Sequence, residues 1–385
     1  MDRVQQGQRR LLRGARLSRR RRQGGQGRLR RAHGQGAAAH ERGLIPVAGR
    51  PERRAPGRRL PVFPWDTLAA ARDRAAAHPS GLVDLTVGSP VDPVAPVLRE
   101  ALASVADRPG YPTTIGTPEL RAAMVSSLAR RYGVSGLDES GVLPVIGTKE
   151  LVAGLPFQLG VGEGHTVVIP EVAYPTYEVG ALVAGASIVR ADSLTQLGPS
   201  SPTLLLLNSP SNPTGKVLGV DHLRKVVGWA RERGVIVASD ECYLGLVWEG
   251  EAPSILDPRV CDGDHTGLLA LHSLSKTSSL ASYRAGFVAG DPALVAELLT
   301  YRKHAGLMVP LPVQAAMTAA LDDDAHESAQ RERYRARRDV LKPAVEAAGF
   351  RIDDSEAGLY LWATRDEPCR DTVAWFAERG MLVAP

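Results

Sequence analysis

Three separate apolar runs in the chain consist of Leu, Val, Ile, Ala and small residues without alternation, and each is followed by polar residues. They are TLLLL before Asn208, VIVAS before Asp240 and LLALH before Ser273. Unbroken runs of this length are typical of strands buried on both faces of a parallel sheet. Open α/β sheets bind ligands at the edge where the carboxyl ends of such strands meet. The chain is therefore predicted to be an α/β protein whose polar strand ends share one crevice.

The segments around these runs alternate between strand and helix patterns, which favours a mostly parallel sheet flanked by helices. Helices are predicted at 65–77, 96–106, 117–132, 149–159, 177–184, 220–233 and 292–303, and further strands at 166–169, 186–191 and 286–289. After residue 311 the pattern predicts one long charged helix at 312–348 and a strand at 358–362. We expect a large domain at 106–308, and a smaller α+β domain formed by 60–105 and an incomplete 309–385.

The first 59 residues differ in charge from the remainder of the chain. They hold 18 Arg, no Lys and three acidic residues, a net charge of +15. Subtracting this from the chain's +5 leaves −10 for residues 60–385. The segment has few large apolar residues and is predicted to be disordered. A basic arm for nucleic acid and a transit peptide are alternative interpretations, but we favour a non-native extension.

The three cysteines are widely spaced and form no CxxC pair, which argues against a disulfide framework or a zinc ribbon. A reducing, cytoplasmic location is expected on this ground. No apolar stretch has the length of a membrane span, so no membrane association is predicted.

Lys276 lies three residues after Ser273 and eight before Arg284 in HSLSKTSSLASYRAGF. A lysine that forms a Schiff base must be partly desolvated, and the end of a buried strand provides that setting. Ser273 and Arg284 can both bind a dianionic phosphate. The alternative is a solvated lysine in a Ser-rich loop, but the combined spacing favours the functional interpretation.

Other polar and aromatic residues at strand ends and helix starts admit both a functional and a structural interpretation. Asp240 can pair with a cationic pyridine nitrogen or cap a helix. Asn212 can donate to a ring oxygen or simply form a turn. Tyr243 can donate to the same ring oxygen or pack in the core. Gly147-Thr148-Lys149 follows LPVI and opens a helix, so its N–H groups form a phosphate site or an ordinary turn. The ring of Tyr174 can cover a flat cofactor or pack in the core.

The motifs SLSK…YRAG, SNPTG, DECY, YPTTIGTPELR and EAGLYLW occur in this order in residues 60–385. Together they resemble the class I/II pyridoxal-phosphate aminotransferases of fold type I, which have a seven-stranded, mostly parallel sheet. The resemblance implies that Lys276 is the Schiff-base lysine and that Asp240 pairs with the pyridine nitrogen. The other implied roles are: Asn212 and Tyr243 on the phenolic oxygen; Thr148, Lys149, Ser273 and Arg284 on the phosphate; Tyr174 on the ring; Tyr111 on the phosphate of a homodimer partner; and Gly88 with Asn212 on the substrate.

Within that family, LPVFPWDTL, IPEVAYPTY and YRAGFVAGDPALV are similar to actinobacterial N-succinyl-diaminopimelate aminotransferases. This implies amino transfer from glutamate to N-succinyl-2-amino-6-oxopimelate, on the route to lysine. Aspartate or aromatic substrates, a β-lyase or decarboxylase, and an aminotransferase-like transcription regulator remain alternatives. The regulator is disfavoured because residues 1–59 lack the apolar spacing of a helix-turn-helix, so only non-specific nucleic-acid contacts are expected.

Two positions depart from the family pattern. Ser282 replaces a glycine two residues before the arginine, where a positive φ would strain the loop. The chain ends at MLVAP, before the strand in which the family carries its carboxylate-binding arginine. A C-terminally truncated protein that binds the cofactor but transaminates poorly is therefore expected.

Overall fold

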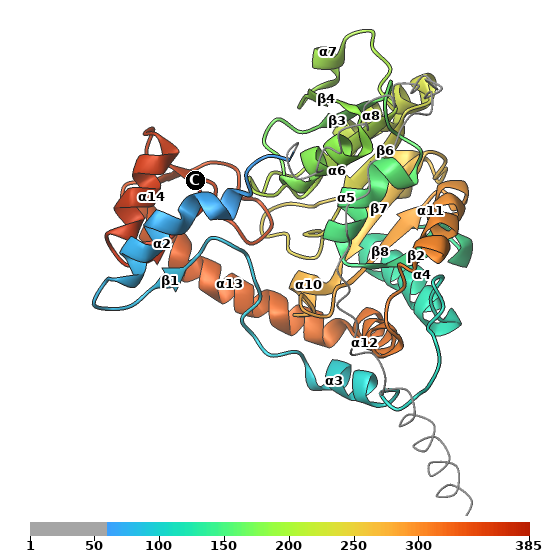
Figure 1. Ribbon diagram of the computed structural model, residues 1–385, viewed down its shortest axis with the longest axis horizontal. Coiled ribbons are helices and arrows are strands. Elements are labelled where there is room, and N and C mark those ends of the chain that lie inside the picture. Colours follow the sequence, from blue (N-terminus) through green and yellow to red (C-terminus); the bar gives the residue numbers. More distant parts are fainter. Residues whose placement is uncertain (1–59) are drawn as a thin grey trace, which may run out of the picture. The chain divides into compact units, whose positions relative to one another are not determined.

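The computed structural model describes residues 60–385, so the predicted extension at 1–59 lies outside the described residues. Its main feature is a seven-stranded sheet of order β2-β8-β7-β6-β5-β3-β4 (Figure 1). The strands are β2 Val142–Ile146, β3 Thr166–Ile169, β4 Ser187–Arg190, β5 Leu204–Asn208, β6 Ile236–Asp240, β7 Leu268–Ser273 and β8 Ala285–Gly290. Strands β4, β3, β5, β6 and β7 run parallel, while β8 is antiparallel to both β7 and β2. The predicted mostly parallel sheet is confirmed.

Helices cover both faces of this sheet, which explains why its central strands are apolar without alternation. One core cluster joins the sheet to α5 (Thr148–Gln158), α6 (Thr176–Ala184) and α11 (Pro292–Ala305). A second core cluster on the other face includes residues of α4 (Pro118–Tyr132) and α8 (Val220–Arg233). Shorter or peripheral helices are η2 Pro64–Leu68, α2 Ala69–Ala76, α3 Pro96–Ala103, η3 Glu139–Gly141, α7 Leu194–Leu197, α9 Pro258–Cys261, α10 Leu274–Thr277 and α14 Cys369–Ala377.

The beginning and the end of the described chain meet in a smaller layer. Strand β1 (Val83–Asp84) pairs in parallel with β11 (Met381–Leu382), and β11 packs against α2 and α14. Leu68, Val373 and Leu382 form a separate small core there. This pairing agrees with a smaller lobe built from both ends, although the exact domain boundaries stay predictions. No helix within residues 60–385 combines the length and apolarity that crossing a membrane requires.

Two predicted elements beyond residue 311 are wrong. The single helix at 312–348 is two helices, α12 (Leu311–Asp322) and α13 (Asp324–Ala347). Asp323 separates them with extended backbone (φ −104°, ψ 107°), and its carboxylate caps the first turn of α13. Aspartate favours such N-cap positions over helix interiors because its side chain competes for backbone N–H groups.

The predicted strand at 358–362 is also wrong, because Gly358 has a positive φ of 81° that interrupts an extended segment. Only a short hairpin forms nearby, between β9 (Arg351–Ile352) and β10 (Ala363–Thr364). The Gly358 N–H donates to the carbonyl of Leu246, and Trp248 donates its indole N–H to the Gly358 carbonyl at 2.7 Å. These contacts hold the segment against the loop that follows β6.

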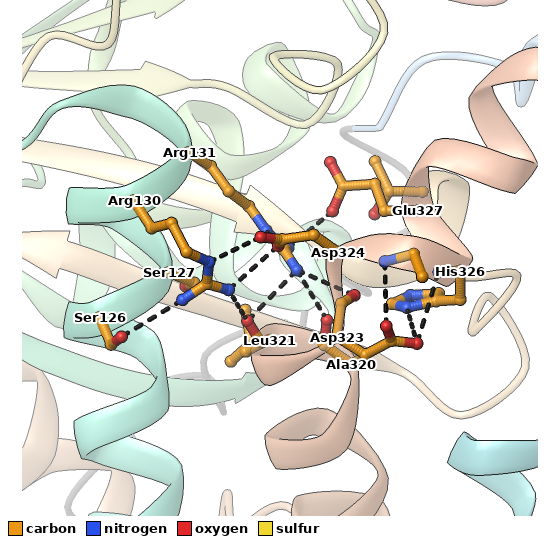
Figure 2. Close-up of polar contacts among 12 residues, drawn as sticks. Ser126, Ser127, Arg130, Arg131, Ala320, Leu321, Asp323, Asp324, His326 and Glu327 are labelled. Carbon is orange, nitrogen blue, oxygen red and sulfur yellow. Dashed lines mark hydrogen bonds and ion pairs between the residues drawn. The ribbon is translucent and has the colours of Figure 1, made fainter.

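Two arginines of α4 bind the junction between α12 and α13 (Figure 2). Arg131 donates to the carbonyl oxygens of Ala320, Leu321 and Asp323 at 3.0–3.3 Å and to the Asp324 carboxylate at 2.7 Å. Its Nη1 lies 2.6 Å from Glu327 Oε2. Helix ends leave carbonyl groups without intrahelical partners, so this guanidinium satisfies the end of α12 and the charges at the start of α13.

Replacement of Arg131 by methionine is expected to lower the free energy of unfolding by about 3 kcal/mol, because the substitution leaves the carboxylate of Glu327 in a largely buried site without its cation. The midpoint and slope of urea unfolding measure this change. Arg130→Met is the matched control. Its side chain is 37% exposed, so its loss should cost no more than about 1 kcal/mol. Equal losses for both variants would contradict the role given to Arg131.

Candidate active site

The predicted meeting of strand ends occurs in the structure. Strands β5 and β6 are neighbours and pair Asn208 with Asp240. The Asn208 side chain donates to the carbonyls of Asp240 and Pro210, at 2.9 and 3.1 Å. Its Oδ1 accepts from the backbone N–H of Asn212 at 2.6 Å. Asn208 therefore fastens the SNPTG loop, which carries Asn212, to the end of β6.

Asp240 is a buried carboxylate at the last position of β6. Tyr177 of α6 donates its hydroxyl to Oδ2 at 2.9 Å, and the Cys242 N–H donates to Oδ1 at 3.2 Å. Burial raises the pKa of Asp240, while these two donors act in the opposite direction. A buried carboxylate with neutral donors alone favours a cationic ligand group beside it.

Lys276 lies on α10, one turn beyond the end of β7. It is mostly buried and donates to the Gly88 carbonyl, while Tyr334 of α13 donates to the carbonyl of Lys276 at 3.0 Å. Burial lowers the pKa of Lys276, and the nearby Arg284 lowers it further. This environment favours a neutral amine, which is the form that attacks an aldehyde and accepts a proton.

The start of α5 and the Arg284 side chain form one cradle for an anion. The guanidinium lies so close to Gly147 that a Cβ at this position would collide with it. Gly147 has a φ of 73° and is followed by the first helical residue, Thr148. A Cβ at Gly286 would lie 3.3 Å from the Thr148 N–H nitrogen. Free N–H groups, a helix N-terminus and a guanidinium together suit a phosphate.

The loop before this arginine tolerates its serine. Ser282 has no positive φ, whereas Ser279 and Arg284 do, at 55° and 57°. Arg284 also donates to the Ala281 carbonyl at 2.7 Å, which closes the loop on itself. Ser273 caps α10 through a bond from the Ser275 N–H at 3.1 Å. The positive φ that would strain the backbone at Ser282 is therefore found at Arg284 instead.

Tyr243 and Gly88 are connected through Tyr360, which we did not single out from the sequence. Tyr360 Oη accepts from the Gly88 N–H at 3.2 Å, and a Cβ on Gly88 would lie 3.0 Å from the same oxygen. The rings of Tyr243 and Tyr360 meet edge to face with centroids 6.3 Å apart. The loop around Gly88 thus lies close to the buried Tyr243, and the glycine allows the tight approach to Tyr360.

Three further predicted residues make no hydrogen bond to the side chains of Asp240, Lys276 or Arg284. Tyr174 is edge to face with Tyr177 at 5.9 Å, beside the Asp240 partner, and Tyr111 is 96% exposed. The Lys149 ammonium lies 5.3 Å from the centroid of the Phe63 ring. Because its ammonium group lies over Phe63, Lys149 can contribute its backbone N–H, rather than its side chain, to the phosphate cradle. Ring stacking by Tyr174 and a contact of Tyr111 with a second subunit stay predictions.

The structure adds several residues to the site that the sequence patterns did not indicate, namely Asn208, Tyr177, Cys242, Tyr334 and Tyr360. Tyr177 is the second tyrosine of YPTY, three residues after Tyr174 and in the first turn of α6. Cys242 Sγ lies 3.2 Å from Thr148 Oγ1, which connects the Asp240 strand to the phosphate cradle. Such contacts between distant segments leave no trace in local sequence patterns.

Comparison with known proteins identifies the family. The model of the class I and II aminotransferases matches residues 80–382. The chain is 65% identical over 386 residues to a probable aminotransferase of Mycobacterium tuberculosis, which covers 100% of this chain and 92% of the relative. It is 56% identical to the 4-dedimethylamino-4-oxo-anhydrotetracycline transaminase of Streptomyces rimosus, over 85% of this chain and 91% of the relative.

Among solved structures, the N-succinyldiaminopimelate aminotransferase of Mycobacterium tuberculosis is similar with a TM-score of 0.76. That similarity covers 86% of this chain and 90% of the solved chain at 24% identity, so it concerns the fold alone. The chain therefore belongs to the class I and II aminotransferases, which use pyridoxal phosphate and have the α/β architecture of fold type I.

Proposed function

We propose that the protein transfers the amino group of glutamate to N-succinyl-2-amino-6-oxopimelate. Amino transfer is supported by one observation. The mostly buried amine of Lys276 lies near the ends of two adjacent strands, which carry Asp240 and the loop of Asn212. The acceptor rests on the similarity of several sequence stretches to N-succinyl-diaminopimelate aminotransferases.

The residues present fit the cofactor. The Gly147–Arg284 cradle suits its phosphate, and the buried Asp240 carboxylate suits its ring nitrogen. Asn212 and Tyr243 would donate to the ring oxygen, and Tyr174 would cover one ring face. When bound, pyridoxal phosphate supplies an aldehyde carbon and a ring that withdraws electrons from the substrate α-carbon.

Each residue in the proposed site has a defined task. The Lys276 amine would accept the proton from the substrate α-carbon and donate it to the aldehyde carbon of the cofactor. Asp240 would keep the ring nitrogen of the cofactor cationic, and Tyr177 favours the charged form of that carboxylate by donating to Oδ2. Burial around Lys276 and Asp240 excludes water, which strengthens these electrostatic interactions.

A homodimer is part of the proposal. Several apolar side chains near the start of the described chain are exposed, including Val62 at 72%, Val91 at 79% and Tyr111 at 96%. Exposed apolar groups of this kind often mark protein interfaces. Sedimentation velocity should therefore report twice the monomer mass, and a Tyr111→Ala variant should bind the cofactor more weakly if Tyr111 serves the neighbouring site.

The acceptor can be tested with a panel of oxo acids and glutamate as the amino donor. The proposed acceptor should give the highest kcat/KM, while pyruvate, oxaloacetate and an aromatic oxo acid should give lower values. Preference for one of the other acids would overturn the proposed substrate but leave amino transfer intact. Release of pyruvate and ammonia from a thioether amino acid would instead indicate a β-lyase.

A second candidate acceptor is a polycyclic ketone. The relative from Streptomyces rimosus, at 56% identity, is a transaminase named for a 4-oxo-anhydrotetracycline. A ketone of this class should therefore be included in the panel. Higher kcat/KM with the ketone than with every oxo acid would favour this candidate.

Replacement of Tyr177 by phenylalanine should lower kcat about tenfold or more, because hydrogen bonds to charged groups contribute roughly 1.5–3 kcal/mol. Without the hydroxyl, the pKa of Asp240 rises further, so the acid limb of the pH profile of kcat should move to higher pH. Stopped-flow rates of the glutamate half-reaction over pH measure both effects. Tyr301→Phe removes a tyrosine hydroxyl on α11 that does not contact Asp240, and an equal shift in that control would contradict the assignment.

A further inference from the structure

A second polar site lies behind the proposed cofactor pocket. Glu241 follows Asp240, and His272 precedes Ser273, so each adjoins a residue assigned to the cofactor. Successive side chains of a strand point to opposite faces of the sheet. Asp240 belongs to the cofactor pocket, whereas Glu241 and His272 line a cavity that Lys276, Asp240 and Arg284 do not reach. Ser273 and Cys242 border this cavity as well, so it adjoins the cofactor site.

This cavity has room for one water molecule. The space open to the centre of a water molecule is about 20 Å³, above the roughly 10–15 Å³ that one water needs. Its walls come from β7, β8 and the loop after β6, and from α4, α10, α12 and α13. The polar side chains among the lining residues include Arg131, Tyr132, Glu241, His272 and Glu327.

Three buried polar atoms of the lining lack a hydrogen-bond partner within the described chain. They are Glu241 Oε2, His272 Nε2 and Glu327 Oε2. The first two belong to side chains that are 1% and 6% exposed, and they lie 3.5 Å apart, too far for an ordinary N–H···O bond. Glu327 Oε2 lies near Arg131 Nη1 without the angle of a hydrogen bond. Unpartnered polar atoms at this depth are costly, so they indicate a bound polar molecule.

The surroundings favour water over a cation. Arg131 already places a positive charge beside Glu327, as Figure 2 shows. No group of three or more His, Cys, Asp or Glu side chains between residues 60 and 385 has an arrangement that could hold a metal ion. Water can donate two hydrogen bonds to the carboxyl oxygens and accept one from the imidazole, which matches the three atoms.

The Glu241 and His272 side chains are held firmly in place. Glu241 Oε1 accepts from the Ile255 N–H at 2.7 Å. The imidazole stacks between Phe287 and Tyr132, at centroid distances of 5.0 and 5.8 Å. A molecule that bridges Glu241 and His272 therefore connects the ends of β6 and β7 to each other, and through Glu327 to α13.

We propose that this cavity binds one water molecule between Glu241, His272 and Glu327, and that the hydrated pair positions Asp240 and Ser273 from the reverse face of the sheet. The positioning part rests on the proposed cofactor site, whereas the water site stands on the cavity and its unpartnered atoms. Glu241 and His272 touch no reacting group in this assignment.

A crystal structure of the cofactor-loaded protein at better than about 2 Å resolution tests the first part. Density for one water within hydrogen-bond distance of Glu241 Oε2 and His272 Nε2 is expected. An empty cavity, or a direct Glu241–His272 hydrogen bond that closes it, would overturn the water site. This outcome does not depend on whether the protein is a transferase.

The positioning part is tested by His272→Phe, which keeps the aromatic stack but removes Nε2. Its dissociation constant for pyridoxal phosphate should rise about tenfold, with a shift of the absorption band of the bound cofactor. His265→Phe is the matched control, because His265 is also buried with an unpartnered Nε2 but does not line the cavity. Equal dissociation constants for the two variants would overturn the positioning role. Absence of cofactor binding in the wild type would overturn the proposed function instead.

A pH measurement covers the case in which His272→Phe does not fold. Burial raises the pKa of Glu241 from its ordinary 4.5 to about 7 and lowers the pKa of His272 to about 3. The other titratable or charged groups near Glu241 are Asp240 on β6, Cys242 in the following loop, Arg131 and Tyr132 on α4, and Glu327 on α13.

Folded Glu241 therefore holds a proton between pH 4.5 and 7 that the unfolded chain releases. Its contribution to stability is complete below pH 4.5 and is lost as the pH rises through 7. Glu241→Gln keeps the size and polarity of the side chain but cannot titrate. The thermal unfolding midpoint of the wild type minus that of Glu241→Gln should thus fall between about pH 4.5 and 7 and then level off. A constant difference would overturn the buried, water-linked state of Glu241.

Discussion

Replacement of Lys276 by alanine is expected to lower kcat of amino transfer by roughly 10⁴-fold, because proton transfer by a positioned side chain contributes 10²–10⁴-fold and the covalent attachment is lost as well. The structure supports this role through the burial of the amine and its lowered pKa. Single-turnover rates with glutamate measure the effect. The absorption of the protein after addition of pyridoxal phosphate should also change, because the variant lacks the amine that binds the aldehyde.

Two controls separate this chemistry from folding. Lys303→Ala removes a lysine in the last turn of α11 and should leave kcat unchanged. Added methylamine should partly restore the activity of Lys276→Ala, because a free amine can replace the missing base. Borohydride reduction of the wild type should place the label on Lys276. A label on another lysine, or activity of Lys276→Ala within tenfold of the wild type, would refute the assignment.

Replacement of Asp240 by asparagine is expected to lower kcat by roughly 10²–10³-fold. Removing one partner of a buried charge pair costs about 3–5 kcal/mol, and a neutral amide cannot keep the ring nitrogen cationic. Burial already raises the pKa of Asp240, so the variant should resemble the wild type at low pH, where its carboxyl carries a proton. Measurement of kcat from pH 5 to 9 should therefore show the largest loss on the neutral and alkaline side.

Asp257→Asn provides the control for this variant. Asp257 is equally buried but pairs with Arg259 at 2.7 Å, away from the strand ends. It should lower stability without a selective loss of kcat. If Asp240→Asn retained kcat within tenfold of the wild type at pH 8, the proposed pairing with the cofactor would be refuted.

Much of the large domain was predictable because its elements have strong local signals. The apolar runs before Asn208, Asp240 and Ser273 predicted three adjacent strand ends, and the helix at 220–233 is observed with the same bounds. The prediction of a single helix at 312–348 was wrong because of one residue, Asp323, which ends the first helix and caps the second. Asp323 is an effective N-cap, but within a long charged segment it reads equally well as a surface residue.

The sequence by itself determined the strand ends and the spacing that brings Lys276, Asp240 and Asn212 to one edge of the sheet. Periodicity and turn chemistry depend on residues close together in the sequence, so they predict where each strand ends and which residues follow it. Only the tertiary structure placed Tyr177 on Asp240, Tyr360 on Gly88 and Arg131 on the α12–α13 junction. These contacts join segments dozens to hundreds of residues apart, and their partners are selected by packing and by the cost of leaving a polar group unpaired in the interior.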